Sequence, residues 1–136
     1  MPTEVQTRLA AIRVLPHAFM RAVVTADPKD VRISKRGGKT VIAVPSEGGV
    51  SRAVLNASNL PERIEAPINH PLLGKTTVVA TYSDFRDWDG YDVVFPGRLT
   101  YTLGGRPWMD LTVSKHAVGG YMVFPIPANL RTAATR

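Results

Sequence analysis

Residues 98–113 read RLTYTLGGRPWMDLTV, and this stretch decides the fold. Apolar and polar residues alternate on both sides of Gly104-Gly105, with one apolar set before the glycine pair and one after it: Leu99, Tyr101 and Leu103, then Met109, Leu111 and Val113. Strict alternation gives a strand one buried and one wet face and is typical of antiparallel sheets. A Gly-Gly pair supplies the positive φ angles of a tight hairpin turn. The stretch therefore predicts two antiparallel strands joined by a hairpin.

The same period of two begins much earlier in the chain. It predicts further strands over six short ranges: 31–34, 40–44, 50–55, 63–68, 76–83 and 91–95. Gly37-Gly38 and Gly48-Gly49 mark two of the turns between them. Pro67 suggests that its strand lies at an edge or contains a bulge, because proline cannot donate a ladder hydrogen bond.

Two helices are predicted to precede the strands. Residues 3–14 carry Val5, Leu9 and Ile12 on one helical face, and Pro16 suits the first turn of a second helix that ends before Pro28. We therefore predict an α+β fold, with a curved, mostly antiparallel sheet of about seven strands and two N-terminal helices. Residues 1–122 would form a single domain, and the Pro- and Ala-rich residues 123–136 a tail or linker.

The composition is that of an ordinary globular domain, with 136 residues, 44% of them hydrophobic and 21% charged. The absence of cysteine excludes disulfide bonds and thiolate metal sites. No basic stretch leads into an apolar run near Met1, and no apolar segment reaches membrane-spanning length. We therefore expect a cytoplasmic protein without a membrane partner.

Part of the net charge of +6 crowds the predicted hairpin around Gly37-Gly38, at Lys29, Arg32, Lys35, Arg36 and Lys39. Such a patch can bind phosphate backbones. No stacking aromatic residue interleaves with these charges, and lysines on a sheet edge discourage strand-to-strand aggregation. We interpret the patch as a solvated hairpin edge, with nucleic-acid binding as the weaker alternative.

Three residues at alternating positions, Tyr82, Asp84 and Arg86, are the first candidates for a site. In an extended strand they would share one face, where Arg86 could pair with Asp84 or Asp87 and leave Tyr82 as a proton donor in a pocket. A structural ion pair that closes the strand end is the alternative. His17, at the start of the second helix, is a candidate acid or base, or a surface or capping group.

The run Asp87-Trp88-Asp89-Gly90, with Asp92 after it, places three carboxylates in one predicted turn. Oxygen ligands at this spacing could hold calcium, but Asp and Gly are also ordinary turn residues, and we favour a turn without metal. Trp88 at its tip is a candidate for contacting a partner, as are Tyr101 and Trp108 in the hairpin above. His70 is expected in a loop, and His116 near a strand end.

Several segments together resemble a known family: residues 15–19, 55–63, 69–74, 82–87, 95–96 and 104–113. Their order and spacing resemble the β-rich domain that precedes the catalytic domain in bacterial metallo-β-lactamase-fold hydrolases. The most specific parts are Tyr82-Ser83-Asp84-Phe85-Arg86-Asp87 and the Gly104-Gly105-x-Pro107 run with its Asp-Leu-Thr-Val ending. The resemblance implies a curved antiparallel sheet, similar to periplasmic lipoprotein carriers and to the cofactor-free enzyme of violacein biosynthesis.

Two departures from the family bear on function. The zinc-binding His-x-His-x-Asp-His motif of the hydrolase part is missing, since His17, His70 and His116 lack its spacing. The family domain also begins upstream with additional strands, so we expect an unpaired sheet edge and an open apolar face here. The unpaired edge and the open apolar face predict a homo-oligomer, a partner protein or a bound apolar ligand.

The sequence thus favours a non-catalytic ligand-binding or assembly module without cofactors, oligomeric or paired with a separately encoded zinc hydrolase. The first alternative is a cofactor-free biosynthetic enzyme that steers a small apolar molecule with Tyr82, Arg86 and His17. The second is nucleic-acid binding by the basic hairpin. No phosphate loop, dinucleotide fingerprint or nucleophile motif is present.

Overall fold

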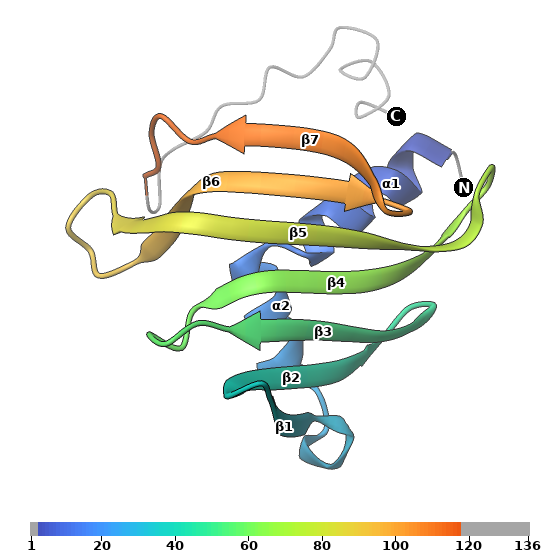
Figure 1. The fold of residues 1–136 in the computed structure, drawn as a ribbon, viewed down its shortest axis with the longest axis horizontal. Helices are drawn as coiled ribbons and strands as arrows, with labels where there is room; N and C mark the ends of the chain where they lie inside the picture. Colours follow the sequence, from blue (N-terminus) through green and yellow to red (C-terminus); the bar gives the residue numbers. More distant parts are fainter. Residues whose placement is uncertain (1–2, 118–136) are drawn as a thin grey trace, which may run out of the picture.

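A seven-stranded open sheet with two helices on one face forms the molecule (Figure 1). The computed structural model describes residues 3–117. The helices are α1 (Thr3–Arg13) and α2 (Pro16–Thr25), followed by the short 3₁₀ helix η1 (Pro28–Asp30). The strands are β1 (Arg32–Arg36), β2 (Lys39–Ser46), β3 (Gly49–Leu55), β4 (Pro61–His70), β5 (Gly74–Asp87), β6 (Val94–Leu103) and β7 (Arg106–Thr112).

The strands run in sequence order from β1 to β7, and every neighbouring pair is antiparallel. This confirms the predicted α+β class and the sheet of about seven strands after two helices. Gly37 and Gly38 both have positive φ angles, 57° and 78°, in the turn between β1 and β2, which is the geometry that a two-residue hairpin turn requires. The tail predicted for residues 123–136 and the domain boundary at 122 lie outside the described residues.

Two predicted strands prove to be one. The ranges 91–95 and 99–103 were expected as separate strands, but β6 runs without interruption from Val94 through Pro96-Gly97 to Leu103. Gly97 permits this because it lies beside Asp84 of β5, where a Cβ atom would collide with the Asp84 carboxylate and carbonyl oxygen. The missing side chain therefore keeps β5 and β6 paired at a point where any larger residue would separate them.

Pro67 does not mark an edge strand, because β4 lies in the middle of the sheet between β3 and β5. The alternative, a bulge, is present in β4, because the β3–β4 register shifts between Val54 and Leu55, although not at Pro67 itself. Pairing between β3 and β4 ends at Arg52–Glu65, two residues before the proline, while pairing with β5 continues at Pro67–Thr77. The β2–β3 turn packs over the ring instead, since a Cβ atom on Gly49 would lie 3.2 Å from Pro67 Cγ. A central strand thus accommodates proline where one of its two ladders has ended.

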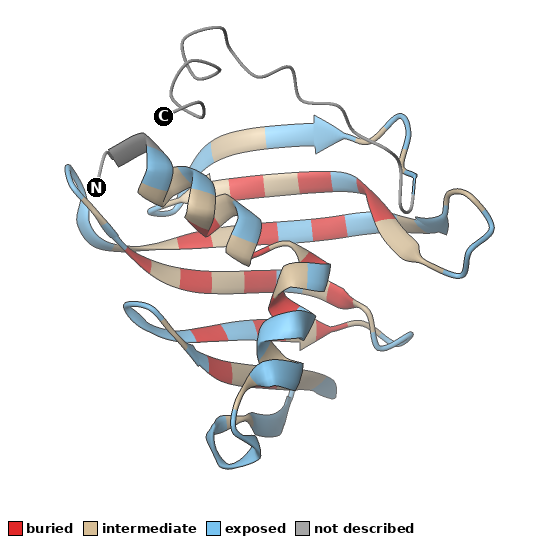
Figure 2. Ribbon diagram, turned by 180° about the vertical axis from the view of Figure 1, so that it is seen from behind, coloured by how far each residue is buried: buried red, intermediate tan, exposed pale blue. Residues whose placement is uncertain are grey.

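The core lies between the helices and the face of the sheet that they cover, here called the inner face (Figure 2). Ala10 of α1, Phe19 of α2 and Val14 between them belong to this core. They cluster with strand residues such as Ile64 and Val78, and all five are nearly inaccessible to solvent. Phe19 and Val23 of α2, and Ala26 just after it, all pack in this core.

For α1 the expected apolar face is not the one that faces the sheet. Val5 and Ile12 are 40% and 54% exposed, while the small Ala10 is buried in the core together with Val14, the residue just after the helix. A small residue brings the helix axis closer to the strands than Leu or Ile would allow. Within the described part of the chain, no helix combines the length and apolarity needed to cross a bilayer.

Candidate binding cleft

A cleft of about 270 Å³ opens between α1, α2 and the β2–β3 hairpin on the inner face. Six side chains form its apolar walls: Ile12, Ala18, Phe19, Ala22, Val44 and Pro45. Four polar residues complete the lining: Arg13, Ser46, Glu47 and Ser51. The cleft therefore combines a mainly apolar surface with a few polar groups, which is the usual character of a small-molecule site.

Local sequence explains the hollow. The helices make their main sheet contacts with β4 and β5, so their cover thins toward β2 and β3. Ala18 and Ala22 of α2 are four residues apart and so lie on the same flank of the helix, and both border the cleft. Their methyl groups leave space that larger side chains would fill. Phe19 and Val44, both 2% exposed, form the rigid part of the wall.

Two serines add a hydrogen-bonding group to this cleft. Ser51 on β3 lies opposite Val44 of β2 and is only 6% exposed. Among the described residues it is the one buried polar residue. Its hydroxyl donates to Ser46 Oγ at 2.7 Å. A hydroxyl carries one donor and two acceptor sites, so this bond leaves capacity on both oxygens. The pair can therefore bind a polar group of a molecule in the cleft.

An ion pair lies beside the same cleft. Arg13, the last residue of α1, contacts Glu47 of the β2–β3 turn at 2.5 Å between Nη2 and Oε2. The two side chains are 39% and 65% exposed. Exposed pairs contribute little to stability, about 0–1 kcal/mol. The pair can thus open or change partner at small cost when a molecule enters.

Tyr82 does not occupy a pocket. It is 3% exposed, and its hydroxyl donates to the Val14 carbonyl oxygen between the two helices. Burial, followed by the neighbouring Tyr101, raises the pKa of Tyr82 far above its ordinary value. The expectation of a proton donor in a pocket is therefore wrong, because this hydroxyl is desolvated and bonded to the backbone that it holds in place.

Asp84 and Arg86 form the ion pair that the sequence suggested. Arg86 Nε donates to Asp84 Oδ1 at 3.0 Å, and Nη2 contacts Oδ2. The hydrogen bond from Arg86 lowers the pKa of Asp84. Asp84 has a φ of 58°, a left-handed conformation inside a strand that Asp tolerates better than most residues. This pair closes the end of β5 beside Gly97.

Trp88 is not the exposed tip that we expected. It is half-buried, its indole N–H donates to the Phe95 carbonyl oxygen at 2.9 Å, and the Arg86 guanidinium lies 5.1 Å from its ring centre. The exposed aromatic residue of this turn is Tyr91, at 71%. Sequence alone could not separate the two, because both lie in the same Asp- and Gly-rich segment.

The acidic turn is held by Asp87. Its two carboxylate oxygens accept hydrogen bonds from the backbone N–H groups of Gly90 and Asp92, at 2.9 and 3.1 Å. The carboxylate thus forms the turn itself. Over residues 3–117, no three acidic or histidine side chains gather in a way that could hold a metal ion.

The three histidines fall in two places. His17 of α2 and His116 lie on either side of Phe95, with ring centres 5.8 and 4.5 Å from it and nearly parallel planes. His116 Nδ1 is buried without a hydrogen-bond partner. His70 is the last residue of β4 rather than the loop residue that we expected, and its Nδ1 accepts hydrogen bonds from the Leu72 and Leu73 backbone N–H groups. His17 therefore lies at the end of the sheet that carries Arg86, while His70 supports the β4–β5 turn.

Tyr101 and Trp108 lie together near the β7 edge. Their rings meet edge to face at 6.1 Å, and both line a shallow hollow of about 350 Å³. Tyr101 is buried, and Trp108 is the extra residue where the β6–β7 register shifts. A bulge re-aims a side chain, which accounts for the position of Trp108.

No protein family, curated protein or solved structure matches this chain. The function proposed below therefore relies on the geometry of the clefts and on the residues that line them.

Proposed function

We propose that the chain is a non-catalytic binding module that holds a small apolar molecule, with one polar group, in the inner-face cleft. The observation that carries the proposal is the part-buried Ser51–Ser46 pair in a mainly apolar hollow. Burial of a polar group is unfavourable unless it is used in a hydrogen bond. A hydroxyl pair beside an open cleft is suited to bind the polar end of a ligand.

The size of the cleft sets the size of the occupant. Its volume of about 270 Å³ is just below the lower end, about 300 Å³, of pockets that take drug-sized ligands. Contact with Phe19, Val44 and Pro45 removes apolar ligand surface from water, which contributes about 25 cal/mol for each Å² buried. A single or fused ring with one hydrogen-bonding atom fits these limits better than a long chain does.

Indole is a suitable probe, because it is flat and apolar and carries one N–H donor for a serine oxygen. We expect saturable binding by isothermal titration calorimetry. 1-Methylindole lacks the donor and should bind about threefold to tenfold more weakly, the value of one hydrogen bond. Ser51→Ala should remove most of that difference between the two probes.

A matched pair of helix variants tests the place of binding. Ala22→Leu fills the cleft from an exposed position on α2 and should abolish indole binding without unfolding the chain. Val24→Leu adds a methylene on the same helix, outside the cleft, at a residue that is 80% exposed, and should leave binding intact. Equal effects of the two substitutions, or no binding of indole to the parent chain, would refute the proposal.

The proposal includes assembly, with a second copy or with the zinc hydrolase that the family resemblance predicts. Support comes from the open sheet: among residues 3–117, the edge strands β1 and β7 each pair with a neighbour on one side only. Ile33 on β1 is 70% exposed. Native mass spectrometry should show a dimer or a complex with a co-expressed hydrolase. A monomer under both conditions would contradict this part.

The cofactor-free enzyme hypothesis has less support, because Tyr82 is sealed in the core. His17 and Arg86 remain exposed near Phe95. If their replacement by alanine halts turnover of a small molecule in a reconstituted pathway, the enzyme hypothesis replaces the binding module.

A further inference from the structure

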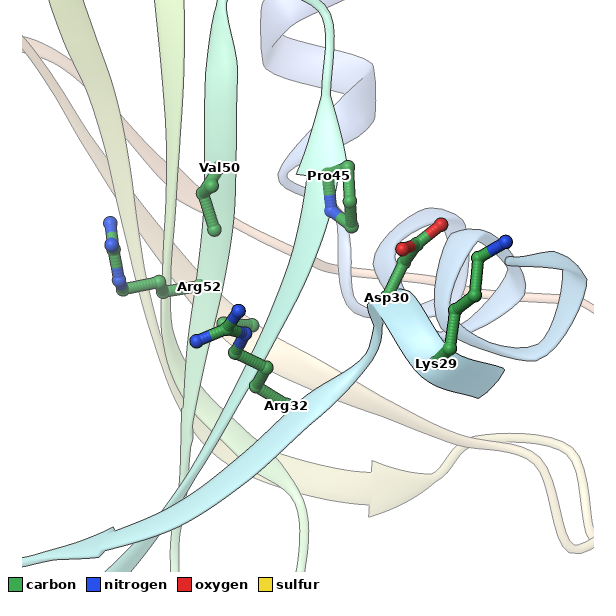
Figure 3. A pocket seen from close by; sticks show the side chains of 7 residues that line it. Lys29, Asp30, Arg32, Pro45, Val50 and Arg52 are labelled. Atoms are coloured by element: carbon green, nitrogen blue, oxygen red, sulfur yellow. The ribbon is translucent and has the colours of Figure 1, made fainter. Parts of the chain in front are cut away.

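A second cleft lies on the opposite face of the β2–β3 hairpin, here called the outer face. It has a volume of about 310 Å³ (Figure 3). The strand register places Arg32 of β1 opposite Ala43 of β2, and Ala43 opposite Arg52 of β3. Directly opposed residues share a face, so two arginines flank one alanine. The small Ala43 leaves the space between them open.

Cations dominate the rim of this cleft. Arg32, Arg52 and Lys29 supply three positive charges and Asp30 one negative charge, a formal balance of +2. In Figure 3 the guanidinium group of Arg32 extends toward Arg52, while Asp30 lies beside Pro45 and Lys29 lies beyond Asp30, with its ammonium group directed away from the two arginines. All four residues are exposed and so can contact a ligand from solvent.

These cations are only partly neutralised within the protein. Lys29 lies 3.1 Å from Asp27, and Arg52 lies 3.8 Å from Glu65, at the long end of an ion pair. Arg32 forms no ion pair with any residue in the described range. Exposed pairs of this kind are weak. An incoming anion can therefore compete with Asp27 for Lys29 and with Glu65 for Arg52, and at Arg32 it has no carboxylate partner to displace.

The floor of the cleft is apolar. Ala43, Pro45 and Val50 form it, beneath the charged rim. A cation cluster on a polar floor would suit a free inorganic ion, whereas this arrangement also covers carbon. The ligand that matches both parts has an anionic head and a compact apolar body.

We propose that this cleft binds a small organic phosphate. Its phosphate group lies between Arg32 and Arg52, and its carbon part lies on Ala43 and Pro45. Planar guanidinium groups bind phosphate oxygens in pairs of parallel hydrogen bonds. A phosphate monoester is a dianion near neutral pH and can bind both Arg32 and Arg52 through different oxygens, while a carboxylate brings only one negative charge to the two arginines. The site is on the other face of the hairpin and does not rest on the function proposed above.

Nucleic acid is the competing ligand for a basic surface, and the cleft favours a small molecule over it. None of the residues that line the cleft is aromatic, so bases have no stacking partner there. Beyond the cleft, Lys35 and Lys39 are engaged with Thr40 and Glu62. Glu62 balances the charge of Lys39, whereas Lys35 bonds to a neutral hydroxyl and keeps its charge. The missing stacking partner is therefore the observation that favours a small molecule over nucleic acid.

Binding of phenyl phosphate, measured by calorimetry with the full chain, tests the proposal. Arg32→Gln should weaken it by about tenfold or more, the usual effect of losing a charge-assisted hydrogen bond. Arg36→Gln is the matched control, since it removes the same charge from an exposed residue of the same strand, outside the cleft. It should change the affinity by less than about twofold, because exposed charges beyond the contact are screened.

Two further ligands identify the part of phenyl phosphate that is recognised. Phenol and inorganic phosphate should each bind much more weakly than phenyl phosphate. Equal binding of inorganic phosphate would overturn the role of the apolar floor, and equal binding of phenol would overturn the role of the cations.

A variant in the floor of the cleft adds a further test of phosphate binding. Ala43→Val narrows the floor and should weaken phenyl phosphate while leaving the folding transition in place. Equal losses for Arg32→Gln and Arg36→Gln, tight and steeply salt-dependent binding of a single-stranded oligonucleotide, or no binding of phenyl phosphate at millimolar concentration would each contradict the proposal. Since indole binding does not involve Arg32, either proposal can fail without the other.

Discussion

The two ends of the sheet use their polar residues in opposite ways. At the β5–β6 end, Asp84 holds Arg86, Arg86 covers Trp88, and Trp88 donates to the Phe95 backbone. At the β2–β3 end, by contrast, Ser51 borders a hollow on the inner face and Arg32 borders one on the outer face. At the β5–β6 end the polar groups bond to one another or to the backbone, whereas at the β2–β3 end several polar groups line clefts.

The difference teaches that residue type is a poor guide to a binding site when partners are ignored. A Tyr-Asp-Arg run attracts attention because those side chains can do chemistry, yet here they mainly fasten strands and helices. Ser51 and the small Ala18 and Ala22 at the other end carry no group that suggests catalysis, but they line the cleft in which we propose that a ligand binds. The β5–β6 end therefore serves stability, and binding at the β2–β3 end is our proposal.

The largest stability effect should come from Gly97→Ala. The added methyl would collide with the carboxylate and the carbonyl oxygen of Asp84, and overpacking of this kind costs about 1–3 kcal/mol. Urea denaturation should show the loss as a lower midpoint. Indole affinity of the folded variant should remain unchanged, because Gly97 is remote from the cleft in the sheet order.

The complementary variant sharpens the comparison. Ala22→Leu should abolish indole binding and change the urea midpoint little, since α2 is exposed there and leucine is a good helix former. If Gly97→Ala impaired binding as much as Ala22→Leu does, the division of labour between the two ends would be wrong.

Tyr82→Phe should destabilise the fold by an amount of the same order as Gly97→Ala. It removes the hydroxyl that bonds to the Val14 carbonyl oxygen, and a buried acceptor left without its donor costs about 1–3 kcal/mol. Tyr91→Phe deletes the same atom from a side chain that is 71% exposed and should leave the unfolding free energy unchanged. Comparable losses in the two variants would show that Tyr82 does not pin the helices.

The smallest effect concerns acid stability. The Arg86 hydrogen bond lowers the pKa of Asp84, so in the folded chain this carboxylate stays ionised below about pH 4, where an unfolded Asp becomes protonated. The pair therefore stabilises the fold above the unfolded-state pKa, and that contribution is lost as pH falls through the lower folded-state pKa.

Asp84→Asn should make stability less dependent on pH in this acidic window, while neutral-pH unfolding changes only slightly because the pair is exposed. Asparagine also tolerates the positive φ at this position. Denaturation series between pH 2 and pH 7 would measure the difference, and parallel curves for the two proteins would contradict the account.

Much of the architecture could be predicted because it is written in local patterns. The alternation of Leu99, Tyr101 and Leu103 and the glycine-pair turns determine strands and hairpins through short-range geometry. The continuity of β6 could not be predicted in this way, since it depends on Gly97 lying beside Asp84, a residue thirteen positions away. The role of Tyr82 likewise depends on Val14, sixty-eight positions away.

The clefts were beyond sequence reasoning for a similar reason. Each cleft is a space between helices and strands, and no single residue type in the sequence predicts it. Ala18 and Ala22 appear in the sequence as ordinary helix formers, and Ser51 as a polar strand residue. Only the arrangement of α2 over the β2–β3 hairpin turns them into the lining of a hollow. The basic hairpin was noticed, but the convergence of Arg32 and Arg52 on Ala43 required the strand register.

The most direct test of the central claim is an amide NMR titration of the ¹⁵N-labelled chain with indole. The account predicts saturable shift changes at Ala18, Ala22, Val44 and Ser51, with Asp84, Arg86 and Trp88 unaffected. Saturable changes centred on Asp84 to Trp88, with Ala22 and Ser51 silent, would contradict it and move the binding site to the other end of the sheet.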